Sequence, residues 1–420
     1  MKRRYGIFII VALFCLLVTS STWADLCKAS PEVLGLSSER LDRIGAILKA
    51  HVEKGVIPGA VALVARRGKL AYLETFGLRD QEASSPMETD TIFQIYSMSK
   101  PITSVGAMML HEQGRLFLRE PISKYIPELG GLSVGVESTD SATGEKIFST
   151  VPSQRDMTIH DLLRHTSGLT YSYFGRSKVV AMYKEAGVGS QDQTLEDMVM
   201  KLSKLPLSSQ PGTKWEYSRS TDVLGRVIEI VSGMSLDKFF QEFIFQPLKM
   251  NDTGFCVKPE RLHEVAKPGP KAKWPSHYGT APPKLLSGGQ GLVSTTLDYA
   301  RFLQMLLNGG ELDGMRLLGR NTVEYMTSDH LGSIPKIGPD YFPGPGYGFG
   351  LGFTVRELSG VAPLPGTVGD YAWMGIGGTN FFVNPREELV AVFMTEANDF
   401  AMMAYYSQLF RILVMQALVD

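Results

Sequence analysis

Cysteine and histidine are both scarce in this sequence. Its 420 residues include three cysteines and seven histidines. Three cysteines are too few for a disulfide framework or a cysteine-rich zinc site. The histidines form no HExxH or His-x-His motif, and His160 and His165 are five residues apart, which does not place them on one face of a helix. Because the usual metal-ligand spacings are missing, we expect a protein without a bound metal.

The sequence also lacks an excess of charge of either sign. The formal net charge is −1, and no long run of like charges occurs. This argues against a strongly basic surface that would attract nucleic acid or an anionic membrane. The hydrophobic content of 44% over 420 residues is sufficient for one large or two ordinary domains with a sizeable core.

A short apolar run lies close to the N-terminus. Three basic residues at positions 2–4 precede the apolar residues 7–18, and small residues follow as far as Ala24. This pattern is typical of a secretory signal peptide, here residues 1–24, so we predict a periplasmic or secreted protein. The run is shorter than the ~20 residues that a membrane-spanning helix needs, which predicts no membrane anchor after cleavage.

The pattern of apolar residues predicts strands near both chain ends and helices between them. Two β-runs close to the N-terminus are separated by a turn at Arg67-Gly68, and β-rich segments return in the last quarter of the chain. The predicted helices are residues 37–54, 102–113, 159–164, 195–202, 221–231, 236–244, 296–308 and 401–418, and the predicted strands include residues 60–65, 70–76, 372–383 and 389–396.

This order of elements predicts an α+β fold with a sheet assembled from the two ends of the chain. A mainly helical region, about residues 115–290, would be inserted between the two halves of the sheet. Residues 130–156 are rich in Gly, Ser, Thr and Asp, so we expect a loop there. The signal peptide contains one cysteine, and whether the remaining Cys27 and Cys256 pair is left open.

A serine occurs three residues before a lysine at three places. The pair Ser235 and Lys238 follows a glycine break, where the serine would cap the next helix and the lysine would be solvated. The pair Ser333 and Lys336 is interrupted by Pro335, which opposes the helical turn that would align the two side chains. Neither pair is therefore expected to carry chemistry.

The pair formed by Ser97 and Lys100 has a different context. The apolar run 92–96 leads to Ser97 at a helix start, and a spacing of three residues places both side chains on one helix face. A helix start also offers a free backbone N–H and a positive dipole end to a developing oxyanion. Lys100 could accept a proton only if burial kept its amine neutral. The alternative, from these residues alone, is a capping serine beside a solvated lysine.

A competing esterase signal is the GLSVG segment, residues 131–135, which matches G-x-S-x-G. That motif forms a nucleophile elbow only between a strong strand and a helix. The flanking segments PELG and ESTDS favour neither element. We therefore do not expect Ser133 to be a nucleophile.

Four further motifs follow the Ser97 segment along the chain. They are LRHTSGL at 163–169, PGTKWEYS at 211–218, GGQGLVS at 288–294 and WMGIGGT at 373–379. Together with SMSK they occur in the order found in the serine β-lactamase and penicillin-binding protein superfamily. The sequence resembles its class C branch, and particularly the β-lactamase-like carboxylesterases of family VIII, over about residues 35–415. The resemblance implies one hydrolase domain, residues 25–420, of the β-lactamase/transpeptidase type with an antiparallel sheet.

The resemblance implies a role for each residue that matches a motif. Ser97 would attack the substrate carbonyl and form an acyl-enzyme, while Lys100 and Tyr217 would handle the protons. A nearby cation would favour the Tyr217 phenolate. The backbone N–H groups of Ser97 and Ile376 would form the oxyanion hole. His165 resembles a structural element of the family, so we expect it to act as a hydrogen-bonded scaffold.

The sequence departs from the β-lactamase pattern at two motifs. It has Arg219 where those enzymes have the asparagine of Tyr-x-Asn, and Trp373-Met374-Gly375 where they have Lys-Thr-Gly or His-Thr-Gly. The missing amide and cation would weaken binding of acylamino groups and carboxylates. Trp-x-Gly at this place is similar to the esterase branch, so Trp373, Gly375 and Arg219 are predicted to contact substrate.

The sequence therefore predicts a serine hydrolase that cleaves small to medium carboxylic esters and needs no cofactor. Its expected partner is a small-molecule ester, with no nucleic acid. Two alternatives remain open at this point. One keeps the same Ser-Lys-Tyr chemistry but acts on β-lactams, D-amino-acid peptides or amides. The other is a binding protein that retains the scaffold without catalysis.

Overall fold

The structure, a computed structural model, describes residues 27–273, 276–338 and 341–420. The predicted signal peptide, residues 1–24, lies outside the described residues. Cys27 and Cys256 are both free thiols. Among the described residues, none of the helices combines the length and the apolar character that a membrane span requires. The same residues contain no cluster of three or more His, Cys, Asp or Glu side chains that could hold a metal ion.

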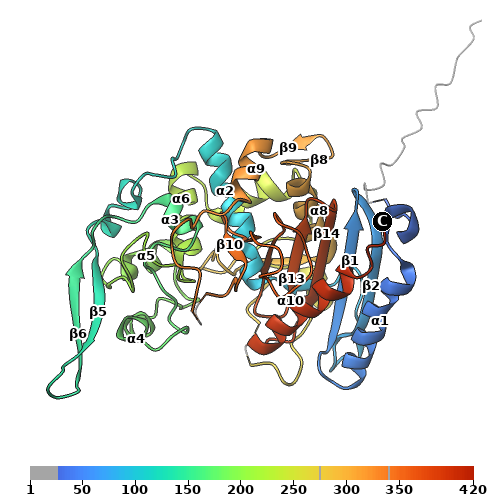
Figure 1. Cartoon of the computed structure of the whole chain (residues 1–420), viewed down its shortest axis with the longest axis horizontal. Helices are drawn as coiled ribbons and strands as arrows, with labels where there is room; N and C mark the ends of the chain where they lie inside the picture. Colours follow the sequence, from blue (N-terminus) through green and yellow to red (C-terminus); the bar gives the residue numbers. More distant parts are fainter. Residues whose placement is uncertain (1–26, 274–275, 339–340) are drawn as a thin grey trace, which may run out of the picture.

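An antiparallel sheet of eight strands joins the two ends of the chain, as predicted (Figure 1). The contact that joins the two ends is between a strand near the N-terminus and one near the C-terminus, with Ala60 opposite Thr395 and Arg66 opposite Leu389. In spatial order the strands are β10 (Tyr347–Phe349), β11 (Thr354–Arg356), β12 (Tyr371–Met374), β13 (Asn380–Asn384), β14 (Leu389–Thr395), β1 (Gly59–Arg66), β2 (Lys69–Asp80) and β3 (Ser85–Pro86).

The first hairpin, β1 to β2, has the turn that the sequence predicts. Arg67 and Gly68 both have positive φ values, 53° and 70°, the backbone that a tight two-residue hairpin requires. Every residue of β1 is buried. Alternate side chains of the strand, such as Ala62 and Leu63, belong to two separate apolar clusters on opposite faces of the sheet.

Helices cover both faces of the sheet. On one face lie α1 (Ser38–Glu53) and α10 (Phe400–Met415), which pack against each other and against the strands (Figure 1). On the other face lies α8 (Thr296–Leu307), which packs on β1 and β14. The helix α2 (Ser99–Glu112) runs through the middle of the molecule between the sheet and the remaining helices (Figure 1).

The middle of the chain is mainly helical, and the predicted helices in it are confirmed to within a few residues. The structure adds two short helices that the sequence did not predict, α4 and α9. The helix predicted at 236–244 becomes α7 and a following π-helical turn, Gln241–Phe245. The bounds are α3 (Ile159–Leu163), α4 (Lys178–Glu185), α5 (Leu195–Leu202), α6 (Ser220–Ser232), α7 (Leu236–Phe240) and α9 (Arg320–Met326).

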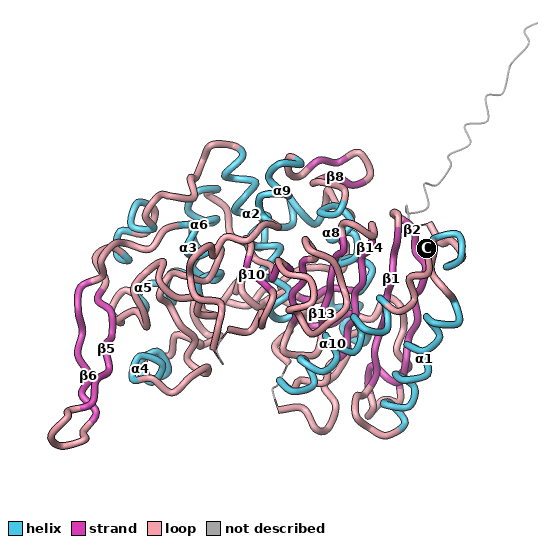
Figure 2. The backbone as a smooth tube through the Cα atoms, in the orientation of Figure 1, coloured by secondary structure: helices cyan, strands magenta, loops and turns pink. Residues whose placement is uncertain are grey.

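The prediction of a loop at residues 130–156 is wrong. This segment forms a hairpin of β5 (Ser133–Thr139) and β6 (Lys146–Pro152), which extends from one end of the molecule (Figure 2). Most of its side chains are exposed on both faces. Without a buried face the strands show no strict alternation of apolar and polar residues, so the sequence carries little strand signal. Two further strand pairs are β4 (Ile92–Gln94) with β7 (Val293–Thr295) and β8 (Glu311–Leu312) with β9 (Met315–Arg316).

Candidate active site

Ser97 lies in a short 3₁₀ turn, Tyr96–Met98, between β4 and α2. Strand β4 is fixed by its pairing with β7, and the Ile95 N–H donates to the Leu292 carbonyl at 3.0 Å. The residue before the serine, Tyr96, has a φ of 44°, a conformation that costs energy for a bulky side chain. The strained turn is held by strands on one side and a long helix on the other. It therefore presents Ser97 at a fixed position.

Lys100 lies one helical turn beyond Ser97 and is almost completely buried, with 1% of its surface exposed. Its Nζ atom lies 3.2 Å from the Ser97 Oγ atom and donates to the Gly289 carbonyl at 2.7 Å. Burial lowers the pKa of Lys100 to about 7; the Asp222 carboxylate opposes this shift and Arg219 adds to it. A neutral amine at this place can accept the proton of the serine hydroxyl.

The Gly289 carbonyl that holds Lys100 is itself fixed by Asp222 on α6. The Asp222 carboxylate accepts hydrogen bonds from the Gly289 N–H, at 3.1 Å, and from the Ser287 hydroxyl. The Thr103 hydroxyl on α2 donates to the neighbouring Gly288 carbonyl at 2.7 Å. These contacts set the direction of the lysine amine.

Arg219 does not contact the substrate cavity, and its predicted role in substrate binding is corrected. Its side chain is 1% exposed and lies 3.2 Å from Asp222 in a buried ion pair. The guanidinium also packs over the ring of Tyr171, 5.0 Å from the ring centre. A buried cation needs a charged partner and hydrogen bonds. These contacts hold Arg219 inside the protein, although its Nε atom has no hydrogen-bond partner among the described residues. Arg219 acts on the site through Asp222.

Tyr217 precedes α6 and contacts both Ser97 and Lys100. The Lys100 Nζ atom lies 4.5 Å from the centre of the Tyr217 ring, and Tyr217 and Ser97 line the same cavity. The Tyr217 hydroxyl is buried without a hydrogen-bond partner of regular geometry among the described residues. Burial raises the pKa of Tyr217 well above its usual value near 10, and the nearby Ser97 and Trp373 side chains oppose the shift.

The prediction that a cation favours the Tyr217 phenolate is therefore wrong. Lys100 loses its proton near pH 7, so it is uncharged at any pH where the phenol could ionise. The other nearby cation, Arg219, is neutralised by Asp222. The chemistry that fits this arrangement is a neutral lysine as the base and a neutral tyrosine hydroxyl that passes a proton on.

His165 supports the Tyr217 ring from behind. The His165 ring is 1% exposed, lies 4.9 Å from the Tyr217 ring centre and contacts the Ser218 hydroxyl at 3.4 Å. Burial lowers the pKa of His165 well below its usual value, with a further contribution from Lys100. The histidine does not line the cavity, and its position is that of the scaffold we expected.

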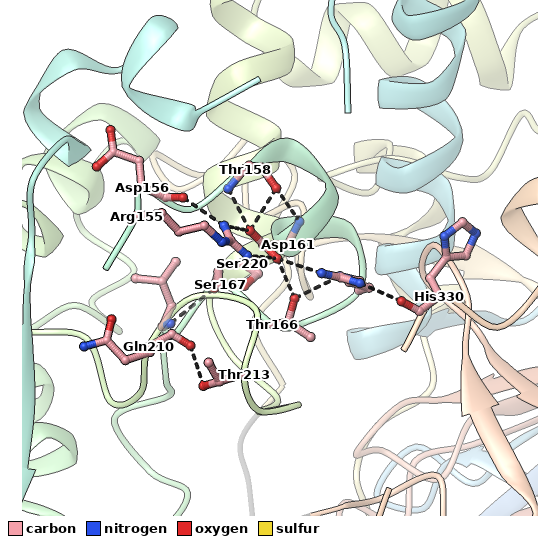
Figure 3. A network of polar contacts seen from close by, with 12 residues as sticks. Arg155, Asp156, Thr158, Asp161, Thr166, Ser167, Gln210, Thr213, Ser220 and His330 are labelled. Carbon is pink, nitrogen blue, oxygen red and sulfur yellow. Dashed lines mark hydrogen bonds and ion pairs between the residues drawn. The ribbon is translucent and has the colours of Figure 1, made fainter. Parts of the chain in front are cut away.

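A buried aspartate, Asp161, lies within the polar network of Figure 3. It bonds to Arg164 and Thr166, the residues on either side of His165. Asp161 accepts hydrogen bonds from Arg155 at 2.6 Å, from Thr166 at 2.8 Å and from Arg164 at 3.1 Å. Burial alone would raise its pKa, but the hydrogen bonds from Arg155, the Thr158 backbone and Thr166 lower it to about 2. The side chain is fully buried, so this network is an important support of the site.

We expect Asp161→Asn to lower the free energy of unfolding by about 2 kcal/mol, because the buried carboxylate loses its charge-assisted hydrogen bonds with Arg155 and Arg164, whose side chains are 42% and 15% exposed. An unfolded aspartate has a pKa of about 3.9, above the folded value of about 2. The carboxylate therefore stabilises the fold above pH ~4, and this contribution is lost as the pH falls towards 2. Urea unfolding across this range should show the difference between the two proteins shrinking at low pH. A constant difference would contradict the expectation.

Of the three predicted residues in the Trp373 segment, two line the cavity and one does not. Trp373, on β12, and Ile376, just after it, both line the cavity. Gly375 does not; its N–H donates to the Thr379 carbonyl at 2.8 Å, and a Cβ atom there would lie 2.5 Å from the Ile95 carbonyl oxygen. The predicted substrate contact of Gly375 is thus replaced by close backbone packing against the residues before Ser97.

That packing brings the backbone of Ile376 towards Ser97. Among the described residues, no hydrogen-bond acceptor is recorded for the backbone N–H of Ser97 or of Ile376. Two free N–H groups at the ends of two adjacent segments are what an oxyanion hole requires.

The cavity at Ser97 has a volume of about 270 Å³ and a mostly apolar lining. It extends from Ser97 along β12 to α10. The side chains that enclose it could not be placed from the sequence alone. Its aromatic lining residues are Tyr96, Tyr173, Phe174, Tyr217, Phe342, Tyr347, Trp373, Phe381, Phe382 and Phe400.

The competing serines lie elsewhere in the fold. Ser133 begins a strand of the exposed hairpin, so no nucleophile elbow forms. Ser235 is the N-cap of α7, as expected, although its hydroxyl forms no capping hydrogen bond. Lys336 forms ion pairs with Asp329 at 2.8 Å and with Glu357 at 2.6 Å, so its amine does not serve as a base for Ser333.

Three residues that matter at the site were missed. Asp222 had a usable signal, because it follows Arg219 by three residues on a helix, where opposite charges meet. Gly289 lay within a recognised motif, but its carbonyl gave no reason to expect a contact with Lys100. Arg411 is the single charged residue of a mainly apolar helix, a pattern that suggests a buried and partnered charge.

The comparisons with known proteins agree with this geometry. The Beta-lactamase family matches residues 44–410. Protein Rv1367c of Mycobacterium tuberculosis (strain ATCC 25618 / H37Rv) is 34% identical over 371 residues, which cover 85% of this chain and 90% of the relative. Esterase EstB of Burkholderia gladioli is 30% identical over 380 residues, 84% of this chain and 89% of the relative.

A solved structure described as EstCE1, a hydrolase with promiscuous acyltransferase activity, is similar to this fold with a TM-score of 0.73 and 27% identity. The match covers 90% of this chain and 98% of that chain. Two of these similar proteins are thus named as an esterase and as a hydrolase with promiscuous acyltransferase activity. The chain belongs to the Beta-lactamase family, within the serine β-lactamase and penicillin-binding protein superfamily, and to its branch of β-lactamase-like carboxylesterases.

Proposed function

We propose that this protein is a serine esterase that cleaves small to medium carboxylic esters through an acyl-enzyme on Ser97. One observation carries the proposal: the Ser97 hydroxyl lies 3.2 Å from the buried Lys100 amine, in the wall of a mostly apolar cavity. A serine is a weak nucleophile unless an adjacent base removes its proton. The lowered pKa of Lys100, about 7, makes its amine such a base.

The proposed reaction has two halves. The Lys100 amine takes the proton of Ser97 as its Oγ bonds to the ester carbonyl, and the N–H groups of Ser97 and Ile376 stabilise the oxyanion. The C–O bond to the alcohol then breaks, and the alcohol leaves with a proton passed on through the Tyr217 hydroxyl. Water next attacks the acyl carbonyl, loses its proton to the same pair, and releases the acid and Ser97.

The cavity supports an ester rather than a β-lactam or a peptide as substrate. Its wall at β12 has Trp373 in place of a cation, and Arg219 is paired inside the protein. Both groups that would hold an acylamino carboxylate near the serine are thus missing. An ester has a better leaving group than an amide and depends less on such contacts. EstB, similar over most of the chain, is named an esterase.

The test is a substrate panel with the purified protein. We expect turnover of p-nitrophenyl acetate and butyrate, and a mass increase on Ser97 equal to the acyl group when the reaction is quenched early. A chromogenic cephalosporin and a D-Ala-D-Ala peptide are the comparison substrates. Faster turnover of either one would replace the esterase proposal with the β-lactamase or peptidase alternative. A fluorophosphonate probe that leaves Ser97 unlabelled would favour a binding protein.

We expect Tyr217→Phe to lower kcat for p-nitrophenyl butyrate by about 10²-fold or more, because the proton relay is lost while the ring and its packing remain. The loss should be larger for an alkyl ester, whose alcohol must be protonated to leave, than for p-nitrophenolate. Comparing ethyl and p-nitrophenyl butyrate measures this difference. Equal losses for both esters would show that Tyr217 does not protonate the leaving group.

A further inference from the structure

Arg411, on α10, is the single charged residue among the described residues that line the Ser97 cavity. Its side chain is 5% exposed and packs over the face of Phe382, 4.5 Å from the ring centre. A buried guanidinium is costly unless it is paired and hydrogen-bonded. The partners of Arg411 therefore decide whether it is only structural.

The partners of Arg411 do not neutralise its positive charge. The Arg411 Nη1 atom donates to the Asp370 carboxylate at 2.9 Å. The same carboxylate is shared with a second buried arginine, Arg356, whose Nε atom lies 3.5 Å away. Two guanidinium groups and one carboxylate leave this cluster with a net charge of +1. Asp370 and Arg356 do not line the cavity.

The second arginine has more hydrogen-bond acceptors in the protein, although its buried Nε atom forms no hydrogen bond among the described residues. The Arg356 Nη2 atom donates to the Tyr347 hydroxyl at 2.8 Å and to the Leu364 and Pro365 carbonyls at 3.0 and 3.2 Å. Arg411 has no such set. Beyond its one bond to Asp370, its other N–H groups have no recorded acceptor among the described residues. Because Arg411 lines the cavity, these donors are available to a group bound there.

Polar neighbours on α10 mark the same part of the cavity. Ser407 and Gln408 precede Arg411 by four and three residues and also line the cavity, so the three share one helix face. The remaining wall between this patch and Ser97 is mainly aromatic and aliphatic. The cavity thus has a nucleophile in one part, a cation in another, and apolar side chains around both.

We propose that Arg411 binds a carboxylate carried by the ester substrate, away from the scissile carbonyl. The inference rests on the proposed esterase function and narrows its substrates to esters with a carboxylate-ended chain. The planar guanidinium suits a carboxylate, which can accept two N–H groups at once. A carboxylate there would also balance the net charge of the cluster. The cation lies on α10 rather than at the β12 position that the β-lactamase pattern uses.

The test measures binding without turnover, using the Ser97→Ala protein and isothermal titration calorimetry. One pair of ligands is monomethyl adipate and the methyl ester of adipamic acid, which differ only in a terminal carboxylate or carboxamide. A second pair, O-acetyl-hydroxycaproic acid and its amide, places the same groups on the alcohol side. A series of half-esters from succinate to suberate varies the length. We expect the carboxylate to bind at least about tenfold more tightly in one orientation.

Variants of Arg411 test whether this side chain causes the preference for a carboxylate over a carboxamide. In Ser97→Ala, adding Arg411→Gln should bring the carboxylate-to-carboxamide ratio to about one, and Arg411→Lys should retain part of it. Arg320→Gln, which removes a charge at a side chain that is 72% exposed, is the control for long-range electrostatics. Circular dichroism melts report whether each variant folds. If Arg411→Gln does not fold, the carboxylate comparison in Ser97→Ala decides.

The outcomes separate this inference from the proposed function. Equal binding of acid and amide at every length and in both orientations would overturn the carboxylate site. An unchanged preference for the carboxylate over the carboxamide in a folded Arg411→Gln protein would also overturn the carboxylate site. Hydrolysis of p-nitrophenyl butyrate by the wild type tests the esterase function independently. If the wild type did not hydrolyse this ester but Ser97→Ala still preferred the carboxylate, the proposed esterase activity would be overturned and the carboxylate site would stand.

Discussion

Ser97→Ala is expected to lower kcat for p-nitrophenyl butyrate by at least about 10⁴-fold. Removing the hydroxyl removes the atom that bonds to the acyl group, and the free backbone N–H groups can then only polarise a carbonyl that nothing attacks. The loss should fall on kcat, with a smaller change in KM, because the cavity lining is unaltered. Initial rates and early-quench mass spectra of the two proteins measure it.

The chain itself provides a matched control for this experiment. Ser235 stands three residues before Lys238, the same spacing as the pair at the site, yet its hydroxyl makes no capping hydrogen bond and Lys238 is exposed. We expect Ser235→Ala to retain the wild-type rate. If Ser97→Ala turned over the ester as fast as Ser235→Ala, Ser97 would not be the nucleophile.

Lys100→Met is expected to reduce kcat by about 10³-fold or more and to change the pH dependence. In the wild type, the amine must be neutral to accept the serine proton, and its pKa is about 7. The rate should therefore rise with pH through about 7 and level off above it. The methionine variant should lose this rise. A wild-type rate that does not change between pH 6 and pH 8 would contradict a lysine base.

The same substitution should stabilise the protein. An unfolded lysine has a pKa of about 10.4, whereas folded Lys100 titrates near 7 because of burial. Between these values the unfolded chain binds the extra proton, so stability rises with pH and burial of Lys100 costs most below pH 7. Each unit of the shift corresponds to about 1.4 kcal/mol. Lys100→Met should therefore raise the melting temperature most at acidic pH.

Lys238→Met is the control for both readouts. Lys238 is exposed, so its replacement should change neither the pH–rate profile nor the pH dependence of the melting temperature. A melting temperature that Lys100→Met lowers at every pH would mean that the amine stabilises the fold. In that case a neutral, desolvated base would be excluded.

The sequence was sufficient for the elements whose signals are local. The turn at Arg67-Gly68 and helices such as α5 and α8 were predicted closely, since each depends on periodicity and on residues at its ends. The meeting of both chain ends in one sheet followed from where the β-rich segments lie. The hairpin β5–β6 was missed because an element exposed on both faces need not alternate.

At the site, the spacing along the chain was enough to make Ser97 and Lys100 neighbours, because three residues make nearly one helical turn wherever the helix lies. Long-range packing alone explains why the lysine is desolvated, why the Gly289 carbonyl directs it, and why Tyr217 contacts it from a distant segment. Contacts between residues far apart in the chain set burial, and burial sets proton affinity. The same reason explains why Arg219, expected at the substrate, is paired inside the protein, while Arg411 faces the cavity.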